Sequence, residues 1–234
     1  MIKDSVYISF LFISSKKFIL SVLQSDNTKK IYEEEISNNN NSNKIEFDKL
    51  DIFLEKNIYK VERIIGSFIK DIIIIYESED IFPIDVSMKN NNNGDFLNNS
   101  SLSRPLLEAR EACLKSHKEN KIIHMLIENF RVNNKNYSFL PENFKCEYYF
   151  LDIKFICISK EITKNLEICM KKFQISVYKI LSGSYLETFF NESEKDPIIW
   201  AMYINNGYNK NEVSFHEKTI KKQGFFEKFF NFFN

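Results

Sequence analysis

The first part of the chain alternates short apolar runs with polar turns. Three such runs come first, at residues 6–13, 18–23 and 30–36. Runs of this length, separated by turn residues, predict a small antiparallel meander of strands. From about Asp48 to Ile65 apolar residues recur at helical spacing, which predicts a helix with one buried face. The isoleucine-rich run at 69–76 then predicts a strand that is buried on both faces.

A second series of elements follows. The pattern predicts a strand, a helix, two strands, a helix and a strand over residues 81–88, 103–120, 122–132, 146–158, 161–173 and 175–180. Ser103, just before Arg104-Pro105, is expected to cap the first of these helices. In the long strand, the face that carries Tyr149, Leu151, Ile153, Phe155 and Cys157 is predicted to be the buried one. Residues 182–210 show little pattern beyond a short helix expected at 198–204, after the break at Asp196-Pro197.

The end of the chain, from Gly224 to Asn234, has a strongly one-sided pattern. At about 100° per residue in a helix, six phenylalanines fall within an arc of about 160°. These are Phe225, Phe226, Phe229, Phe230, Phe232 and Phe233. Lys221 and Lys222, just upstream, are placed to meet anionic lipid head groups, at on the order of 1 kcal/mol each. The pattern predicts an amphipathic helix that lies on a membrane surface, and packing on the protein's own core or on a partner is the alternative.

Composition and charge narrow the functional classes. The chain has 234 residues, 44% of them hydrophobic, which is typical of one large or two small globular domains. Lys plus Arg and Asp plus Glu both number 32, so no overall field would draw the protein to nucleic acid, and any attraction to a membrane must be local. No nucleic-acid partner is therefore expected, and no apolar run approaches the length that spans a bilayer.

Residues that could carry chemistry are few. Four cysteines, at Cys113, Cys146, Cys157 and Cys169, form no CxxC pair, so they are interpreted as reduced core thiols in a cytoplasmic protein. His124 lies in a predicted strand between apolar neighbours, which favours a structural histidine over a catalytic base. No Ser-His-Asp arrangement, Walker loop or carboxylate pair can be proposed from spacing, so we expect no catalytic residue, no metal site and no cofactor.

Three stretches within residues 106–185 carry a resemblance to a known family. Residues Lys121 to Phe130 are similar to a strand of the form vlHvip-x-x-Y, and Leu151 to Ile158 to a strand vhlitc. Ile162 to Leu166, followed by Ile175 to Val177, is similar to n-x-x-k-c-v-x-x-x-g-l-x-v. In this order they resemble the actin-like bacterial cell-division family FtsA, and they cover the strand-helix-strand-strand subdomain that FtsA inserts into the actin fold.

The same resemblance bears on nucleotide binding. Residues Phe10 to Lys16 stand where the family has its first phosphate-binding hairpin, which resembles D-I-G-T-S-K, but the carboxylate and the glycine are missing. Backbone amides cradle phosphate closely only where glycine permits the approach. After Tyr185 the family continues into a second actin lobe with a second phosphate hairpin, whereas this chain runs almost directly to its last residues. ATP is therefore not expected as a cofactor, and the protein is not expected to be an enzyme.

The fold class expected from the pattern and the resemblance is α+β. Residues 1–80 are expected to be a partial actin-like lobe of a three-strand meander, a helix and a strand. The split strand-helix-strand-strand-helix-strand subdomain is expected at 81–181, an irregular linker at 182–214, and the membrane-binding helix at 215–234.

The resemblance implies a non-enzymatic cell-division adaptor, peripheral at the cytoplasmic face of the cell membrane, that tethers divisome components there. Residues 81–181 would serve protein interaction and self-association. FtsA proteins hold the tubulin-like FtsZ with the lobe that is missing here, so other divisome proteins are expected partners and FtsZ stays open. The alternatives are a degenerate actin-like ATPase that forms membrane-bound filaments and an unrelated α+β protein-binding module.

Overall fold

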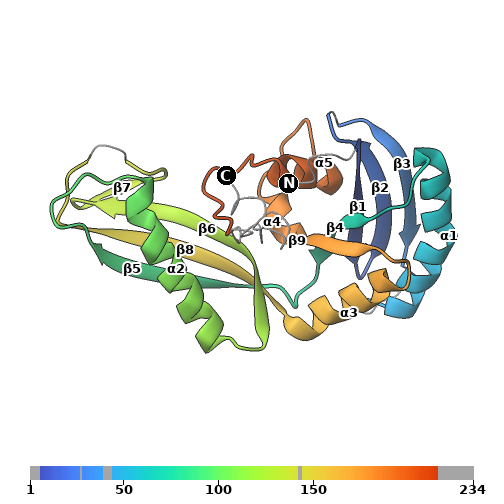
Figure 1. The fold of residues 1–234 in the computed structure, drawn as a ribbon, viewed down its shortest axis with the longest axis horizontal. Helices are drawn as coiled ribbons and strands as arrows, with labels where there is room; N and C mark the ends of the chain where they lie inside the picture. Colours follow the sequence, from blue (N-terminus) through green and yellow to red (C-terminus); the bar gives the residue numbers. More distant parts are fainter. Residues whose placement is uncertain (1–5, 27, 39–43, 142–143, 216–234) are drawn as a thin grey trace, which may run out of the picture.

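The computed structural model describes residues 6–26, 28–38, 44–141 and 144–215 and places two sheets toward opposite ends of an elongated molecule (Figure 1). The predicted helix at 224–234 lies outside the described residues, together with Lys221, Lys222 and the six phenylalanines of its apolar face.

The first sheet contains five strands in the order β3-β2-β1-β4-β9. Its strands are β1 (Tyr7–Ser14), β2 (Lys17–Gln24), β3 (Lys30–Ser37), β4 (Asp71–Glu77) and β9 (Ser176–Ser182). The first three form an antiparallel meander, whereas β4 runs parallel to β1, and β9 runs parallel to β4. The three-strand meander, the helix and the strand β4 are confirmed as the sequence predicts, and β9 adds a fifth strand that was not expected in this sheet.

Helices cover both faces of this sheet. One face packs against α1 (Phe47–Ile65) and α3 (Lys160–Lys171), and the other against α4 (Gly183–Glu187) and α5 (Pro197–Asn205). In β4 the side chains of Ile72 and Ile74 face α1, while Ile73 and Ile75 face α5, and all four are fully buried. The doubly buried strand is therefore confirmed.

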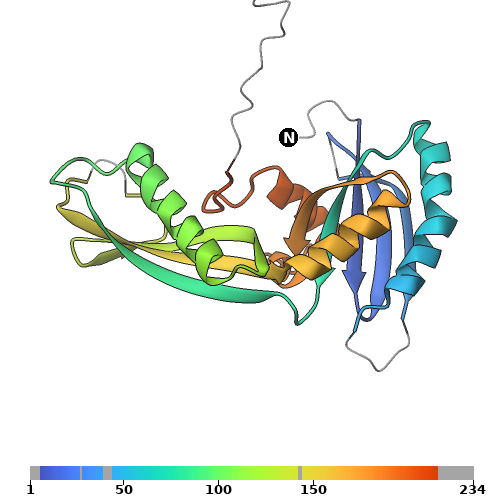
Figure 2. The same ribbon diagram turned by 60° about the horizontal axis from the view of Figure 1, so that its bottom comes forward.

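The second sheet has the strand order β5-β8-β6-β7, with antiparallel neighbours. Its elements are β5 (Phe82–Asn91), α2 (Asn99–Ser116), β6 (Asn120–Val132), β7 (Lys135–Tyr137) and β8 (Tyr148–Ser159). Figure 2 shows α2 lying along one face of the sheet. Leu151, Ile153 and Phe155 are at most 1% exposed on that face, so the predicted orientation of β8 is correct.

Two elements expected in the second unit belong to the first sheet. Strand β9 pairs with β4, and Leu166 and Met170 of α3 pack in the same core as α1. The split strand-helix-strand-strand-helix-strand unit is therefore divided, and its inserted part ends near Ser159, where β8 passes directly into α3. The cause is tertiary: β4 has a second edge that needs a partner, and local periodicity does not reveal which sheet a strand will join.

Helix α2 begins earlier than the sequence predicts. Its N-cap is Asn98, whose side-chain oxygen accepts from the amides of Ser100 and Ser101 at 2.9 and 3.1 Å, so the predicted cap at Ser103 is wrong. Pro105 consequently lies inside the helix, where it has no N–H to donate to the carbonyl of Ser101. The hydroxyl of Tyr149 donates to that carbonyl at 2.8 Å, which repairs the defect and fastens α2 to β8.

The region expected to be an irregular linker covers the second face of the first sheet. The short helix expected at 198–204 is confirmed as α5, with Asp196 as the N-cap and Pro197 in the first turn. Six of its residues are buried, namely Ile198, Ile199, Trp200, Ala201, Met202 and Ile204. A helix that is apolar all round shows no amphipathic period, which explains why the sequence pattern there is weak.

Candidate functional site

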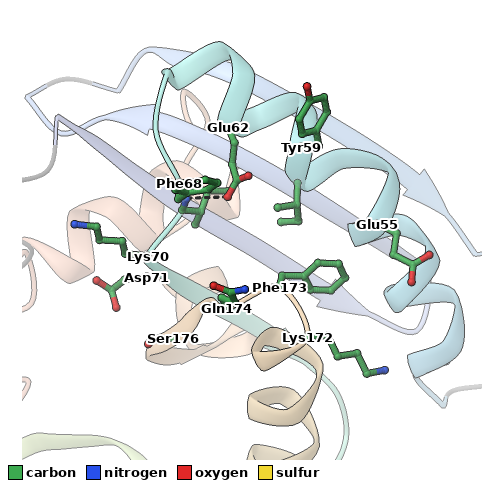
Figure 3. A pocket seen from close by; sticks show the side chains of 12 residues that line it. Glu55, Tyr59, Glu62, Phe68, Lys70, Asp71, Lys172, Phe173, Gln174 and Ser176 are labelled. Carbon is green, nitrogen blue, oxygen red and sulfur yellow. Dashed lines mark hydrogen bonds between the residues drawn. The ribbon is translucent and has the colours of Figure 1, made fainter.

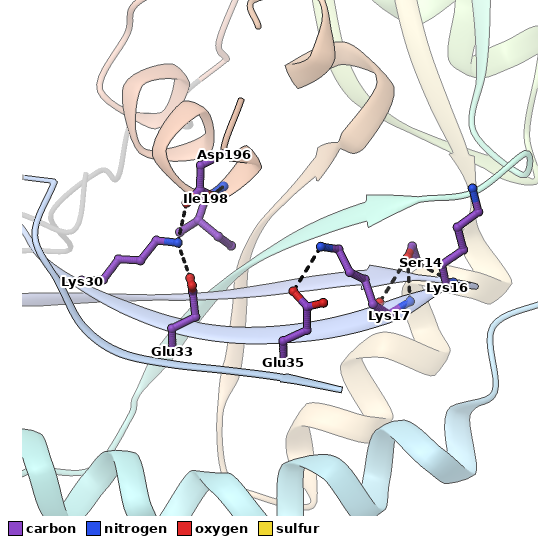
Figure 4. Close-up of polar contacts among 8 residues, drawn as sticks. All are labelled: Ser14, Lys16, Lys17, Lys30, Glu33, Glu35, Asp196 and Ile198. Atoms are coloured by element: carbon purple, nitrogen blue, oxygen red, sulfur yellow. Dashed lines mark hydrogen bonds and ion pairs between the residues drawn. The ribbon is translucent and has the colours of Figure 1, made fainter. Parts of the chain in front are cut away.

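The turn between β1 and β2 closes the stretch Phe10 to Lys16, which the resemblance to FtsA aligns with the first phosphate-binding hairpin of that family. Here the hydroxyl of Ser14 accepts from the amides of Lys16 and Lys17 at 3.2 and 3.1 Å and donates to the carbonyl of Lys17 at 3.1 Å (Figure 4). The ammonium of Lys17 pairs with Glu35 of β3 at 3.1 Å. The amides of Lys16 and Lys17 therefore already donate hydrogen bonds within the turn and are not available to a phosphate.

The carboxyl ends of β4 and β9 lie beside this turn and are closely packed. A Cβ on Gly183 would come within 2.8 Å of the Cβ of Glu77, so the start of α4 lies directly on the end of β4. Burial and the neighbouring carboxylate of Glu187 raise the pKa of Glu77, while Lys16 and Lys17 act in the opposite direction. Within the described residues, no group of three or more His, Cys, Asp or Glu side chains is placed to hold a metal ion.

A buried polar network joins the two sheets. His124 of β6 is fully buried, and its Nε2 accepts from the backbone amide of Ser182 at the end of β9, at 3.0 Å. Its Nδ1 lies 2.9 Å from Oε1 of Glu212. Tyr185 of α4 donates to the other oxygen of Glu212 at 3.1 Å and accepts from Asn209 at 2.9 Å. We call His124, Ser182, Tyr185, Asn209 and Glu212 the junction network.

Electrostatics fix the protonation states of this network. Burial lowers the pKa of His124, so the ring is neutral at pH 7. Since Nε2 is an acceptor, the proton lies on Nδ1 and is donated to Glu212. Burial raises the pKa of Glu212, but the hydrogen bond from His124 and the charge of Lys179, 3.4 Å away, lower it by more. The pKa is therefore below its usual value, and the carboxylate is ionised. His124 is a satisfied structural residue, as the sequence predicts.

The same network seats the last described segment of the chain on β6. Val213 donates its amide to the carbonyl of Met125 at 2.8 Å, and Ile127 donates to the carbonyl of Asn211 at 3.0 Å. The side-chain amide of Asn211 also donates to the carbonyl of Ser138 at 2.8 Å. Residues 211–213 therefore act as a short added strand at the edge of β6.

A cavity of about 920 Å³ opens beside this segment, between the two sheets. We call it the junction cavity. Tyr178 and Lys179 of β9, Ile123 and Met125 of β6, Arg110 of α2 and Phe215 line it, among other residues. The guanidinium of Arg110 lies 5.1 Å from the centre of the Phe215 ring, a cation–π contact that holds the end of the described chain at the cavity.

A second hollow, of about 670 Å³, lies on the first sheet between α1 and the turn from α3 to β9 (Figure 3). We call it the helix groove. Tyr59 and Phe68 line it with 73% and 80% of their surfaces exposed, and Phe173 lies half-buried at the end of α3. Glu55, Glu62 and Asp71 supply its carboxylates, and Glu62 also accepts from the amide of Ile69 at 3.1 Å.

Sequence reasoning missed most of the junction network. Tyr185, Asn209 and Glu212 come from the region that shows little pattern, and only the tertiary fold brings them to His124. The predicted membrane-binding residues are neither placed nor tested, because they lie beyond Phe215. All four cysteines are buried, as expected for core thiols. No helix in the described ranges has the length and apolar character needed to cross a bilayer.

Comparison with known proteins gives no family assignment. No family model and no curated protein matches the chain. Among solved structures, it is similar to the cytoplasmic domain of EpsL, an inner membrane component of the type II secretion system of Vibrio cholerae, with 9% identity and a TM-score of 0.40. It is also similar to the PilM-PilN type IV pilus biogenesis complex, with 7% identity and a TM-score of 0.48, and to a Bacteroides thetaiotaomicron protein with an actin-like ATPase fold and unknown function, with 15% identity and a TM-score of 0.32.

These three matches cover 77%, 78% and 80% of this chain but only 58%, 49% and 56% of the other chains, so the chain spans about half of their length. At such identities the likeness concerns the fold alone.

Proposed function

We propose that this protein is a non-enzymatic adaptor that holds a protein partner at the inner face of the cytoplasmic membrane. Following the resemblance to FtsA, we propose the cell-division machinery as its setting. The observation that carries the proposal is the seating of residues 211–213 on β6, at the mouth of the junction cavity. The segment that leads to the predicted amphipathic stretch is thereby fastened beside the junction cavity, where we place the partner.

The β1–β2 turn supports the non-enzymatic part of this proposal. The positions expected to hold the carboxylate and the glycine hold Leu11, Phe12 and Ile13 here. The hydroxyl of Ser14 accepts hydrogen bonds from the amides of Lys16 and Lys17. A phosphate would have to displace that hydroxyl, and the turn has no glycine to let the backbone come close. We therefore expect isothermal titration with Mg-ATP to give no binding, and a micromolar, magnesium-dependent affinity would favour the degenerate ATPase instead.

The membrane part is tested by sedimenting the full chain with vesicles of phosphatidylethanolamine and phosphatidylglycerol. Changing Phe226 and Phe229 to Glu places two charges where the acyl boundary should be, so binding should fall by orders of magnitude. The control variant, with Lys221 and Lys222 changed to Gln, should weaken binding modestly and chiefly at low salt, because that attraction is screened. Equal pelleting of the double Glu variant and the parent chain would refute the anchor.

A further inference from the structure

We propose that the phenylalanine-rich segment 225–233 docks in the helix groove when no membrane is present, so that the protein's own surface competes with lipid for the anchor. This inference rests on the proposed function, which makes that segment the anchor. It adds an off-membrane state in which the six phenylalanines are covered.

The groove offers aromatic surface that the rest of the fold does not use. Tyr59 projects from α1 and Phe68 from the loop after it, and both are largely exposed (Figure 3). Ile58 and Phe173 also line the groove. A large exposed aromatic surface in a concave site is typical of a docking surface. An amphipathic helix places its apolar face into such a groove through side chains at helical spacing.

Charge favours this segment as the occupant. Glu55, Glu62 and Asp71 line the groove. Lys172, which also lines it, is engaged with Asp51, which leaves Lys70 as the other cation along the lining. Within the segment Glu227 balances Lys228, and the positive charge lies just before it, at Lys218, Lys221 and Lys222. The groove thus combines apolar surface with carboxylates, and the end of the chain combines apolar surface with ammonium groups, so the two surfaces are complementary.

The groove is within reach of the chain end. Phe215 lines the junction cavity together with Tyr178, and Ser176, two positions earlier in β9, lines the helix groove. Strand residues advance by about 3.3 Å each, so the two hollows meet β9 about 7 Å apart. Residues 216–224 can span up to about 30 Å when fully extended. The extended linker is therefore several times longer than the separation of the two hollows along β9.

Docking within one chain needs only a weak contact. A short tether gives an effective concentration on the order of 1 mM. With a dissociation constant of about 100 µM between segment and groove, the docked state would outnumber the open state about tenfold. The apparent affinity for vesicles would then be about tenfold lower than the intrinsic affinity, since lipid binds the open state.

The first experiment measures vesicle sedimentation of the full chain with Tyr59 and Phe68 changed to Ser. Both side chains are largely exposed, so the melting temperature should stay within a degree or two of the parent value, about the range of surface changes. Removing them should strengthen vesicle binding by about five- to tenfold, because the competing state is lost. The matched control is Phe139→Ser, which removes a 63% exposed phenylalanine from the other unit and should change nothing. If the parent chain binds vesicles and the double Ser variant binds them equally or more weakly, the proposal is overturned.

The second experiment separates this inference from the proposed function. A fluorescein-labelled peptide of residues 215–234 is titrated against the full chain that carries Phe226→Glu and Phe229→Glu, so that its own segment leaves the groove empty. Anisotropy should show saturable binding, and adding Tyr59→Ser and Phe68→Ser should abolish it. If the peptide binds vesicles but not this chain, docking is wrong and the anchor stands. If the peptide binds the groove but neither the parent chain nor the double Ser variant binds vesicles, docking is supported and the membrane anchor is refuted.

Discussion

Replacement of Glu212 by Ala should detach the C-terminal segment from the junction between the sheets. The carboxylate accepts hydrogen bonds from the Nδ1 of His124 and the hydroxyl of Tyr185. His124 has no alternative arrangement, because its Nε2 must remain an acceptor for the amide of Ser182. Both donors would be left buried without an acceptor, since the side chains of His124 and Tyr185 are almost completely enclosed.

The loss can be worked from these contacts. Each buried donor without a partner costs about 1 to 3 kcal/mol, so Glu212→Ala should lower the free energy of unfolding by about 2 to 6 kcal/mol. This is a large share of the 5 to 15 kcal/mol that is roughly typical of folded domains. Glu212→Gln keeps an acceptor for His124 but turns an N–H₂ group toward the hydroxyl of Tyr185, so it should cost about 1 to 2 kcal/mol.

Urea unfolding at pH 7 measures these differences, and hydrogen exchange locates them. The amides of Val213 and Ile127, which link the segment to β6, should exchange much faster in Glu212→Ala. The control is Glu128→Ala, on the same strand as His124, which removes an exposed ion pair with Lys154 of β8 and should cost at most about 1 kcal/mol. A loss below about 1 kcal/mol for Glu212→Ala, with unchanged exchange at Val213, would refute the assigned role of the network.

Three further outcomes are expected from urea unfolding. Phe155→Ala should cost about 3 to 5 kcal/mol, because the ring is fully buried under α2. Tyr149→Phe should cost about 1 to 2 kcal/mol by leaving the Ser101 carbonyl without its donor, and a neutral result would mean that water replaces the hydroxyl. Burial lowers the pKa of His124 in the folded protein. At pH values below the ordinary pKa of 6.5 the unfolded chain therefore binds more protons than the folded one, and the free energy of unfolding should decrease as the pH is lowered. The lowered pKa of Glu212 should add a further loss below 4.5, and an acid slope that survives unchanged in His124→Gln would assign the effect elsewhere.

The elements that sequence pattern predicts well are those whose burial is local. Strand β4 reads as an unbroken isoleucine run because helices cover both of its faces, and β8 alternates because α2 covers only one face over most of its length. The predictions fail where a residue far away in the sequence determines where an element begins or which sheet it joins. Pro105 suggests a helix start nearby, but Tyr149, far along the chain, satisfies the carbonyl that the proline leaves free and so lets α2 begin at Asn99.

The candidate site was harder to predict for the same reason. The apolar neighbours of His124 indicate a buried histidine, and this much follows from local sequence. Its partner Glu212 is 88 residues away, in a stretch without hydrophobic period, and a single carboxylate there carries no signal of its own. The expectation that the chain has no phosphate-binding hairpin comes from Phe10 to Lys16, which lack the carboxylate and the glycine of the FtsA motif that they resemble, and it stays a prediction.

The seating of residues 211–213 also sets how far the junction cavity can lie from a bound membrane. Because Val213 is bonded to β6, the chain that reaches the predicted helix at Gly224 starts from Val213, which allows at most about 40 Å. Without the seat it would start from the end of α5 at Asn205, and the limit would rise to about 70 Å. Glu212→Ala should therefore leave the affinity of the six phenylalanines for lipid intact while letting the folded part stand farther from the bilayer. Energy transfer from Trp200 to a head-group acceptor should fall in that variant at equal vesicle binding, and unchanged transfer would show that the seat does not fix the distance.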